Sequence, residues 1–542
     1  YKETVGDEFD KVVPAIFTDE PQFCRKGTFA FATSDQEVTL PWTPEFDRLF
    51  SEHYGEKIEE KLPELFWEKE GGEVSRTRYL YHDLVCELFT EAFADNCGDW
   101  CEKNGISMTG HMMAEDSLGS QTMCLGEAMR SYRKFQIPGI DMLCGGHNYA
   151  TAKQCQSAVH QYGREGMLSE LYGVTDWDFD FRGHKHHGDW QAALGVTVRV
   201  PHLSWMSMYG EAKRDYPASI FYQSPWYREY PYIEDHFARL NTALTRGKPK
   251  VDIAVIHPVE SYWLHWGPSE NTGTIRGRIE SNFQSTVDWL LFAQLDFDFI
   301  SEGLLPEQFG GVEDKKLKVG EMAYKVVIVP GLETIRKTTL EALGKFKAAG
   351  GTVIVMGDLP KYEDAVESDV PKKILGGSKK IQFLRDELIA ALEPFRTVGI
   401  RNAGGDIAGN YIYNYRHDND CEWHFICRGR NPSLAGNRSG YNNAENLKIT
   451  LEGEFTPIIW DTISGGTYPA DYEVRDGKTI IRRSMYQHDS LLLKLLPYDA
   501  EIKSETKPAL RTEREIFVRK PVAYRLDEPN ALLIDQAEWR VD

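Results

Sequence analysis

Short apolar runs that end in polar residues alternate with helical segments over about residues 1–240. The runs are "VPAIFTDE" (13–20), "GISMTGH" (105–111), "GIDMLCGG" (139–146), "GMLSELYG" (166–173) and "VTVRVPHLSW" (196–205). Strands that alternate with helices indicate a parallel sheet, because each parallel pair needs a crossover connection that is usually a helix. This pattern limits the first part of the chain to an α/β fold.

A long amphipathic helix is predicted between the first two strands, over "RTRYLYHDLVCELFTEAFADNCGDWC" (76–101). Leu80, Leu84 and Leu88 recur at helical spacing and form one apolar stripe, which is typical of a helix that packs on a core. Cys97 and Cys101 lie one turn apart on it. No second Cys or His pair stands nearby at zinc spacing, so we favour buried helix cysteines over a metal site.

Five βα units are too few to close an eight-stranded barrel. Residues 1–12 resemble a helix that packs before the first strand, so the chain is expected to begin inside a larger domain. With three further units before it, region 1–245 would form the C-terminal five units of a (β/α)8 TIM-type barrel. Glu20 would then end strand four and Glu170 strand seven of that barrel.

The runs "KVDIAVIHP", "LDFDFIS", "YKVVIVPG" and "GGTVIVMGD" predict a second, flavodoxin-like or glutaminase-like α/β domain over residues 250–400. An amidotransferase would need a nucleophilic cysteine at a strand-to-helix turn. No cysteine stands between Cys155 and Cys421, so that activity is rejected. A structural or oligomerisation role is preferred, and a homo-oligomer is one expected assembly.

The last part of the chain alternates strand-like runs with polar turns. "NYIYNYRHDNDCEWHFICRGR" has an Asp-Asn-Asp turn between two runs, which indicates a hairpin. Together with "NLKITLEGEFTPIIWDT", "GKTIIRRSM" and "DSLLLKLLP" it predicts a β-sandwich accessory domain over 405–500. Residues 501–542 are expected to start a further β element.

Charge and cysteine content exclude several classes of function. The 542-residue chain has a formal net charge of −21 and no block of Lys or Arg, which argues against nucleic-acid or anionic-membrane partners. No apolar run approaches the roughly 18 residues that would span a membrane. Nine scattered cysteines do not suggest a disulfide framework, which favours a reducing, cytoplasmic location.

Two strand-end glutamates suggest hydrolysis of a glycosidic bond. That reaction needs one carboxylic acid to protonate the leaving oxygen and one carboxylate to attack C1 or activate water. Glu20 and Glu170 would meet this need from the C-terminal ends of their strands. Asp19 is expected on the opposite face of its strand from Glu20, where its charge would still raise the pKa of Glu20. A salt bridge at the barrel rim is the alternative for either glutamate.

Further polar and aromatic side chains at the same ends suit a sugar pocket, although each is equally well explained as a packed rim residue. The predicted hydroxyl-binding and ring-stacking residues are His111, Glu115, His147, Trp177, His202, Trp205 and Tyr209. The histidines of "GHKHHGD" (His184, His186 and His187) are read as part of a solvated polar loop, and no metal site is predicted there.

Several segments together resemble bacterial glycoside hydrolases such as family 106, the α-L-rhamnosidases. The resemblance covers about residues 1–500 and rests on "FTDEP", "PWTPEFDRLF", "SELYG", "GDWQAALGVTVRVPHLSW" and "KVDIAVIHPVESYW". It implies a (β/α)8 barrel, an α/β domain, a β-sandwich and a carbohydrate substrate, and calcium only as a trait of that family. "FTDEP" and "SELYG" differ from the "SWE" and "AEAF" expected of a rhamnosidase, which leaves the sugar open.

Three hypotheses follow. The first is a glycosidase of the rhamnosidase-like group that removes a terminal sugar, with Glu20 as the acid and Glu170 as the nucleophile or base. The second is a β-galactosidase-like retaining hydrolase with the same two carboxylates. The third is a catalytically silent carbohydrate-binding protein in which these groups only bind hydroxyls.

Overall fold

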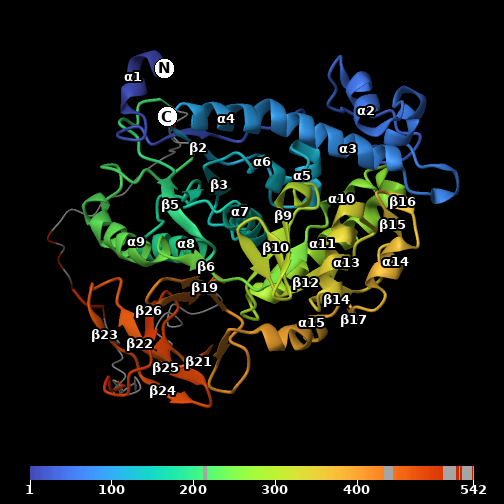
Figure 1. The fold of residues 1–542 in the computed structure, drawn as a ribbon. Helices are drawn as coiled ribbons and strands as arrows, with labels where there is room; N and C mark the ends of the chain where they lie inside the picture. Colours follow the sequence, from blue (N-terminus) through green and yellow to red (C-terminus); the bar gives the residue numbers. More distant parts are fainter. Residues whose placement is uncertain are drawn as a thin grey trace.

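The computed structural model describes residues 1–210, 216–431 and 444–504, with six further residues at 521–523, 525, 527 and 540. Figure 1 shows a parallel sheet with its helices, a second α/β unit beside it and antiparallel sheets below. The β element predicted over 501–542 lies almost entirely outside the described residues. Among those residues, no helix is both long and apolar enough to cross a membrane.

The first sheet contains the five predicted strands, all parallel and in the order of the chain, and it curls into half of a barrel (Figure 1). This part of the fold prediction is confirmed. The strands are β1 (Ala15–Thr18), β2 (Ser107–Gly110), β3 (Ile137–Met142), β4 (Met167–Leu171) and β5 (Val196–Pro201). The helices that follow β2 to β5 are α5 (Leu118–Cys124) with α6 (Ala128–Ser131), then α7 (Tyr149–Gln161), α8 (Phe181–Ala193) and α9 (Tyr230–Leu244).

The long helix predicted over 76–101 is also confirmed. It runs as α3 (Arg76–Phe89), one π-helical segment (Thr90–Asp95) and α4 (Asn96–Lys103), after the short helices α1 (Lys2–Val5) and α2 (Phe46–Tyr54). Leu80 and Leu84 are buried as the apolar stripe requires. Cys101 is buried and Cys97 half-buried, and both are free thiols.

The second α/β unit has a five-stranded parallel sheet in the order β17-β14-β12-β7-β8. Its strands are β7 (Ile253–Ile256), β8 (Phe297–Ile300), β12 (Val326–Pro330), β14 (Thr352–Met356) and β17 (Lys379–Ile381). The first four match the four predicted runs. The fifth was not predicted, because its three residues include two exposed lysines and form no apolar run.

Helices and small strands complete this unit. The helices are α10 (Val259–Trp263), α11 (Ser269–Leu291), α12 (Leu305–Gln308), α13 (Lys337–Ala348), α14 (Val370–Leu375) and α15 (Arg385–Leu392). Two small sheets were not predicted: β9 (Phe309–Glu313), β10 (Lys316–Val319) and β11 (Met322–Tyr324), and β13 (Thr334–Ile335), β15 (Tyr362–Glu363) and β16 (Val366–Glu367).

The C-terminal part forms two antiparallel sheets that share one apolar core, as a β-sandwich does. One sheet holds β18 (Val398–Arg401), β21 (Glu445–Glu452), β25 (Lys478–Met485) and β24 (Tyr472–Arg475). The other holds β23 (Thr467–Pro469), β22 (Phe455–Trp460), β26 (Ser490–Pro497), β20 (Glu422–Arg428), β19 (Tyr411–His417) and β6 (Lys248–Pro249). The predicted hairpin at 418–421 joins β19 to β20. The linker strand β6 ties the sandwich to the end of the half-barrel.

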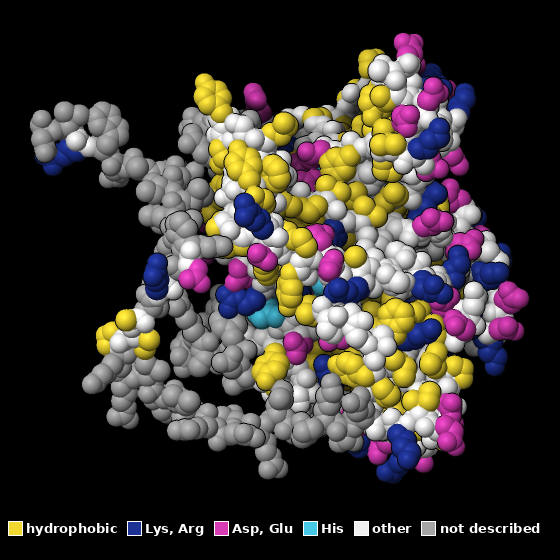
Figure 2. Space-filling model, turned by 90° about the vertical axis from the view of Figure 1, so that its left-hand side faces the viewer, with side chains coloured by type: hydrophobic (Ala, Val, Ile, Leu, Met, Phe, Trp, Pro, Cys, Tyr) yellow, Lys and Arg dark blue, Asp and Glu magenta, His cyan; other side chains and the backbone are white. Residues whose placement is uncertain are grey.

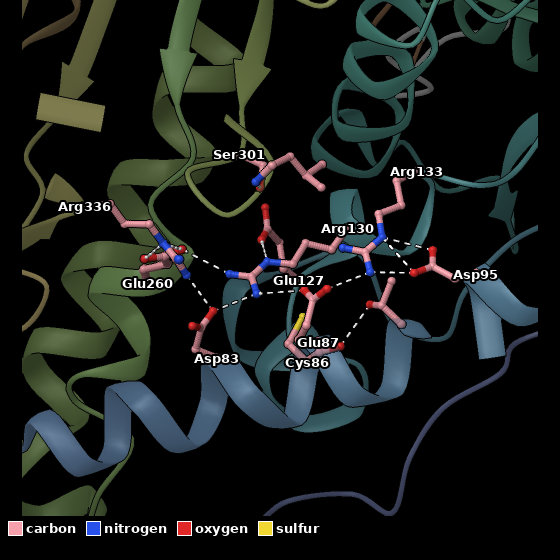
Figure 3. Close-up of polar contacts among 12 residues, drawn as sticks. Asp83, Cys86, Glu87, Asp95, Glu127, Arg130, Arg133, Glu260, Ser301 and Arg336 are labelled. Carbon is pink, nitrogen blue, oxygen red and sulfur yellow. Dashed lines mark hydrogen bonds and ion pairs between the residues drawn. The ribbon is translucent and has the colours of Figure 1, made fainter. Parts of the chain in front are cut away.

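A buried ion network holds the half-barrel against the second α/β unit (Figure 3). Arg130 on α6 contacts Asp83 of α3 at 2.7 Å and Glu127 at 2.8 Å, both within the half-barrel region. It also contacts Glu260 of α10 at 3.2 Å, across the boundary. Arg336 of the second unit then joins Glu260 at 2.7 Å and Asp83 at 2.5 Å. Because Glu260 is only 2% exposed, its charge depends on these two guanidinium groups.

We expect Arg130→Ala to reduce the free energy of unfolding by about 3–5 kcal/mol, because it leaves the buried Glu127 without its counter-charge and leaves Asp83 and Glu260 with Arg336 alone. Urea denaturation followed by circular dichroism measures this. Arg48→Ala removes an exposed pair with Glu52 and serves as the control, which should unfold like the wild type. Equal unfolding midpoints for the two variants would contradict a stabilising role of the network.

Candidate active site

Polar side chains from all five strands gather at the C-terminal edge of the half-barrel sheet. They are Asp19 and Glu20 after β1, His111 after β2, Asp141 in β3, Glu170 in β4 and His202 after β5. In barrels of parallel strands, the C-terminal edge is where active sites form. The structure therefore brings Glu20, Glu170, His111 and His202 of the predicted set to one edge.

The imidazole of His111 joins two of these strand ends. Its Nε2 lies 2.9 Å from Glu170 Oε2, within hydrogen-bonding distance. The side chain thus spans β3, which lies between β2 and β4 in the sheet. The chain turns into His111 at Gly110, whose φ is 118° and where a Cβ atom would stand 1.9 Å from the Thr18 carbonyl. Only glycine fits there. His202 Nε2 stands 4.0 Å from the other oxygen of Glu170.

His111 is held in its charged form. Burial opposes the charge, but the hydrogen bond to Glu170 and the negative charges of Glu115, Asp141 and Glu170 raise the pKa of His111 to about 9. The carboxylate of Glu170, whose side chain is 13% exposed, accepts this hydrogen bond. Glu170 is thus held in a fixed orientation, which attack on a carbon or activation of water requires.

Asp141 is a site residue that the sequence reasoning missed. It pairs directly with Glu170 in the β3–β4 register. Burial raises the pKa of Asp141 to about 7; the charge of His111 opposes this rise, whereas those of Glu170, Glu20 and Asp19 add to it. All four side chains therefore lie within electrostatic reach of Asp141. The one signal in the sequence was an acidic residue inside the apolar run "GIDMLCGG".

The expectation that Asp19 faces away from the site is wrong. Strand β1 ends at Thr18, so strict alternation stops before Asp19. Asp19 is 69% exposed and its Oδ1 lies 3.8 Å from His111 Nε2, on the same side as Glu170. Glu20 follows with a φ of 49°, a left-handed conformation that is uncommon for residues other than glycine.

Left-handed residues recur in the loops at this edge. After Glu20 come Ala114 beyond β2, Cys144 beyond β3, and Tyr172, Val174 and Asp176 beyond β4. A β-branched residue such as Val174 rarely adopts this conformation. Backbone strain of this kind clusters at functional sites, because the surrounding structure must hold it in place.

The side chains of Glu115 and His147 make their contacts in the protein interior and not at the C-terminal edge of the sheet. The Glu115 carboxylate is buried and accepts hydrogen bonds from the Met112 amide at 2.9 Å and the Tyr132 hydroxyl at 3.0 Å. Burial raises its pKa to about 7. His147 stacks on Trp190 and lines a cavity of about 310 Å³ between the half-barrel loops and α11. Neither residue has a described contact with Glu170.

The reading of His184, His186 and His187 as a solvated loop is wrong. All three lie on α8 and are buried. His186 Nε2 is 3.1 Å from His147 Nε2, and burial lowers the pKa of His186 and His187 to about 3. This segment has a polar sequence, but it forms a helix that packs on both the half-barrel and the sandwich. These histidines are neutral packing groups.

Aromatic side chains form a rim beyond β4 and β5. The rings of Trp177 and Trp205 are 6.1 Å apart, half-buried and tilted. Tyr209 is 90% exposed and Met206 92% exposed. Figure 2 shows hydrophobic side chains gathered on the side of the molecule to which the β5 and α9 segment belongs. Such a surface suits stacking against the apolar face of a sugar.

Two groups of described residues bring three potential metal ligands within 4.8 Å of one another: Asp19, His111 and Glu170, and Asp418, Asp420 and Cys421. Calcium takes six to eight oxygen ligands. The first group includes an imidazole and the second a thiol, so neither suits the calcium that the family resemblance implies.

Comparisons with known proteins support the fold. No family model and no curated sequence matches the chain. Among solved structures, a rhamnosidase from Novosphingobium sp. PP1Y is similar over 89% of this chain and 46% of its own, with a TM-score of 0.66 and 16% identity. The chain thus spans about half the length of that protein.

Two further enzymes share the architecture. An exo-carrageenase from Bacteroides ovatus is similar over 88% of this chain and 66% of its own (TM-score 0.56, 12% identity). A β-galactosidase from Bacillus circulans sp. alkalophilus is similar over 85% of this chain and 78% of its own (TM-score 0.54, 13% identity). At these identities the likeness establishes a glycosidase-like fold.

The raised pKa of His111 makes stability depend on pH. Its folded pKa of about 9 exceeds the ordinary value of 6.5, so its contribution is fully present below about pH 6.5 and is lost as pH rises through 9. We expect the wild type to lose on the order of 3 kcal/mol relative to His111→Gln over this interval. Urea denaturation at pH 6 and 9.5 measures the difference.

An NMR titration of the histidine ring protons separates the causes. Glu170→Gln removes the negative charge and leaves at most a weaker, neutral hydrogen bond to His111, so the ring should titrate at lower pH in that variant. A His111 resonance that titrates near 6.5 in the wild-type protein would refute the charged pair.

Proposed function

We propose that the chain is a glycoside hydrolase that cleaves a terminal sugar from an oligosaccharide or glycoside by means of two carboxylates. The observation that supports this best is the convergence of Glu20 and Glu170 on Asp141 at the C-terminal edge of the half-barrel. The similarity to three glycosidase structures agrees with it.

Glu170 acts as the nucleophile or base. Its hydrogen bond from His111 fixes one carboxylate oxygen, which leaves the other oxygen for C1 of the sugar or for a water. Glu20 acts as the general acid and gives its proton to the leaving oxygen. His202, at 4.0 Å from Glu170, and the Trp177 and Trp205 pair hold the sugar.

The rhamnosidase-like group is the preferred assignment, because the family resemblance of the sequence and the TM-score of 0.66 to a rhamnosidase point the same way. A β-galactosidase-like retaining hydrolase is the alternative, supported by the TM-score of 0.54 to such an enzyme. A carbohydrate-binding protein without turnover would use the same carboxylates only to bind hydroxyls.

A screen of four aryl glycosides tests the assignment directly. The substrates are the nitrophenyl α-L-rhamnoside, β-D-galactoside, α-L-arabinoside and β-D-glucuronide. We expect turnover of one neutral glycoside, and the anomer first released, observed by NMR, distinguishes retention from inversion. Sugar binding with no turnover of any substrate would favour the binding protein.

Leaving groups of different basicity separate the two glutamates. Glu20→Gln should lose most activity on an alkyl glycoside but much less on a nitrophenyl glycoside, because nitrophenolate departs without a proton. Glu170→Gln should lose several kcal/mol of transition-state stabilisation on both, because attack at C1 fails whichever group leaves. Values of kcat/KM for the two substrates measure this.

Added azide and one matched variant complete that experiment. Azide should restore turnover of the nitrophenyl substrate to a small-side-chain variant of Glu170, since a small anion can replace a nucleophile or base. Glu165→Gln is the control: Glu165 is exposed at the opposite end of the same strand and should leave kcat/KM unchanged. Equal and mild losses for Glu20→Gln and Glu170→Gln would contradict the assigned roles.

A further inference from the structure

One carboxylate oxygen of the site is buried without a partner. Among the described residues, no donor lies within hydrogen-bonding distance of Asp141 Oδ1. Burial of a polar atom without a hydrogen bond costs free energy, and native proteins rarely keep one without a reason. His111 directs its Nε2 to Glu170, and no hydrogen bond from His111 to Asp141 is found among the described residues.

A second strand aspartate shows what a structural role looks like in this chain. Asp298 on β8 is fully buried, and its two oxygens accept from the His160 imidazole at 2.9 Å and the Tyr324 hydroxyl at 2.9 Å. Asp298 is thus satisfied by its own protein. Asp141 also lies on a parallel strand, yet its Oδ1 has no such partner among the described residues, and it faces the edge where Glu170 and His111 meet.

The side chains around Asp141 indicate what kind of ligand could form the missing hydrogen bond to its Oδ1. Glu170 lies beside it in the register, and Glu20 and Asp19 act on it from β1. The histidines of the same edge are His111 and His202. A negatively charged ligand would be repelled by this set of carboxylates, whereas a neutral hydroxyl can both donate to and accept from a carboxyl group.

We propose that Asp141 is a substrate-binding residue that holds a hydroxyl of a neutral sugar ring against Glu170 through Oδ1 and selects against acidic sugars. The part about a sugar rests on the proposed function. The unpartnered Oδ1 of Asp141 lowers the stability of the free protein, and a hydroxyl of the bound sugar ring supplies the missing hydrogen bond. A residue of this kind lowers stability in the free protein and raises affinity for the ligand.

Two variants of Asp141 test this against a packing role. Affinity for L-rhamnose, D-galactose and L-arabinose is measured by saturation-transfer NMR and calorimetry, and unfolding by the thermal midpoint at pH 8. For the sugar that binds, Asp141→Ala should weaken affinity about tenfold or more, while Asp141→Asn, which keeps a hydrogen-bonding group of the same shape, should lose less. The thermal midpoint of both variants should equal or exceed that of the wild type.

Asp298→Asn is the matched control. Its amide can accept at only one of the two oxygen positions, so one of the two hydrogen bonds is lost and the thermal midpoint should fall, while sugar affinity at a temperature where the variant is folded stays unchanged. In the aryl glycoside screen, Asp141→Asn should also reduce the preference for neutral substrates over the β-D-glucuronide.

The outcomes separate this inference from the proposed function. If a sugar binds the wild type without turnover and binds Asp141→Ala more weakly, the hydrolase proposal is contradicted and the role of Asp141 is supported. If the wild type turns over a substrate and Asp141→Ala binds the sugar with unchanged affinity, the hydrolase proposal is supported and the role of Asp141 is contradicted. A fall in the thermal midpoint of Asp141→Ala like that of Asp298→Asn, or no binding of any of the three sugars to the wild type, would overturn the inference.

Discussion

The parallel alignment of five strands is the constraint on which the site depends. Because β1 to β5 run in one direction and lie in chain order, the residues at their C-terminal ends come from five distant parts of the sequence to one edge. The register is equally important. It places Asp141 beside Glu170, and a slip of β3 by one residue would turn Asp141 to the other face of the sheet. Hydrogen bonds between backbones therefore determine which side chains can react together.

The same alignment creates an electrostatic problem whose solution divides the roles of the side chains. Two carboxyl groups on neighbouring strands do not both ionise readily when they are partly buried. His111 resolves this unequally, since it bonds to Glu170 and not to Asp141. The hydrogen bond holds Glu170 in place, whereas burial raises the pKa of Asp141 to about 7, where a carboxylic acid can donate a hydrogen bond. Two similar side chains on neighbouring strands thus differ in their surroundings, one bonded to the imidazole and the other set apart by burial.

The strands were predictable from the sequence because each is a short apolar run bounded by polar residues, and a parallel sheet buries such runs on both faces. The site was predictable only in part. Glu20 follows its strand, whereas Glu170 and Asp141 are each the residue before the last of theirs. Asp141 was missed although an acidic residue inside an apolar run was the signal that could have revealed it. Asp19 was misplaced because strand alternation was extended past Thr18, where the strand has ended. His186 and its neighbours were misread because burial between two domains leaves no mark on the local polarity of a segment.

Contacts from the second α/β unit reach the segment that carries Glu20, which argues that this unit supports the site. Lys26, six residues beyond Glu20, is buried with its Nζ 2.8 Å from Nδ1 of His82 on α3. His82 stacks on Trp263 of α10, with ring centroids 6.2 Å apart, and the guanidinium of Arg130 lies over the same indole at 5.4 Å. The ion network that joins the two units therefore also supports the contact that fixes the segment after β1. Since close-packed groups transmit displacement, movement of α10 would shift Lys26 and with it the backbone that holds Glu20 in its left-handed conformation.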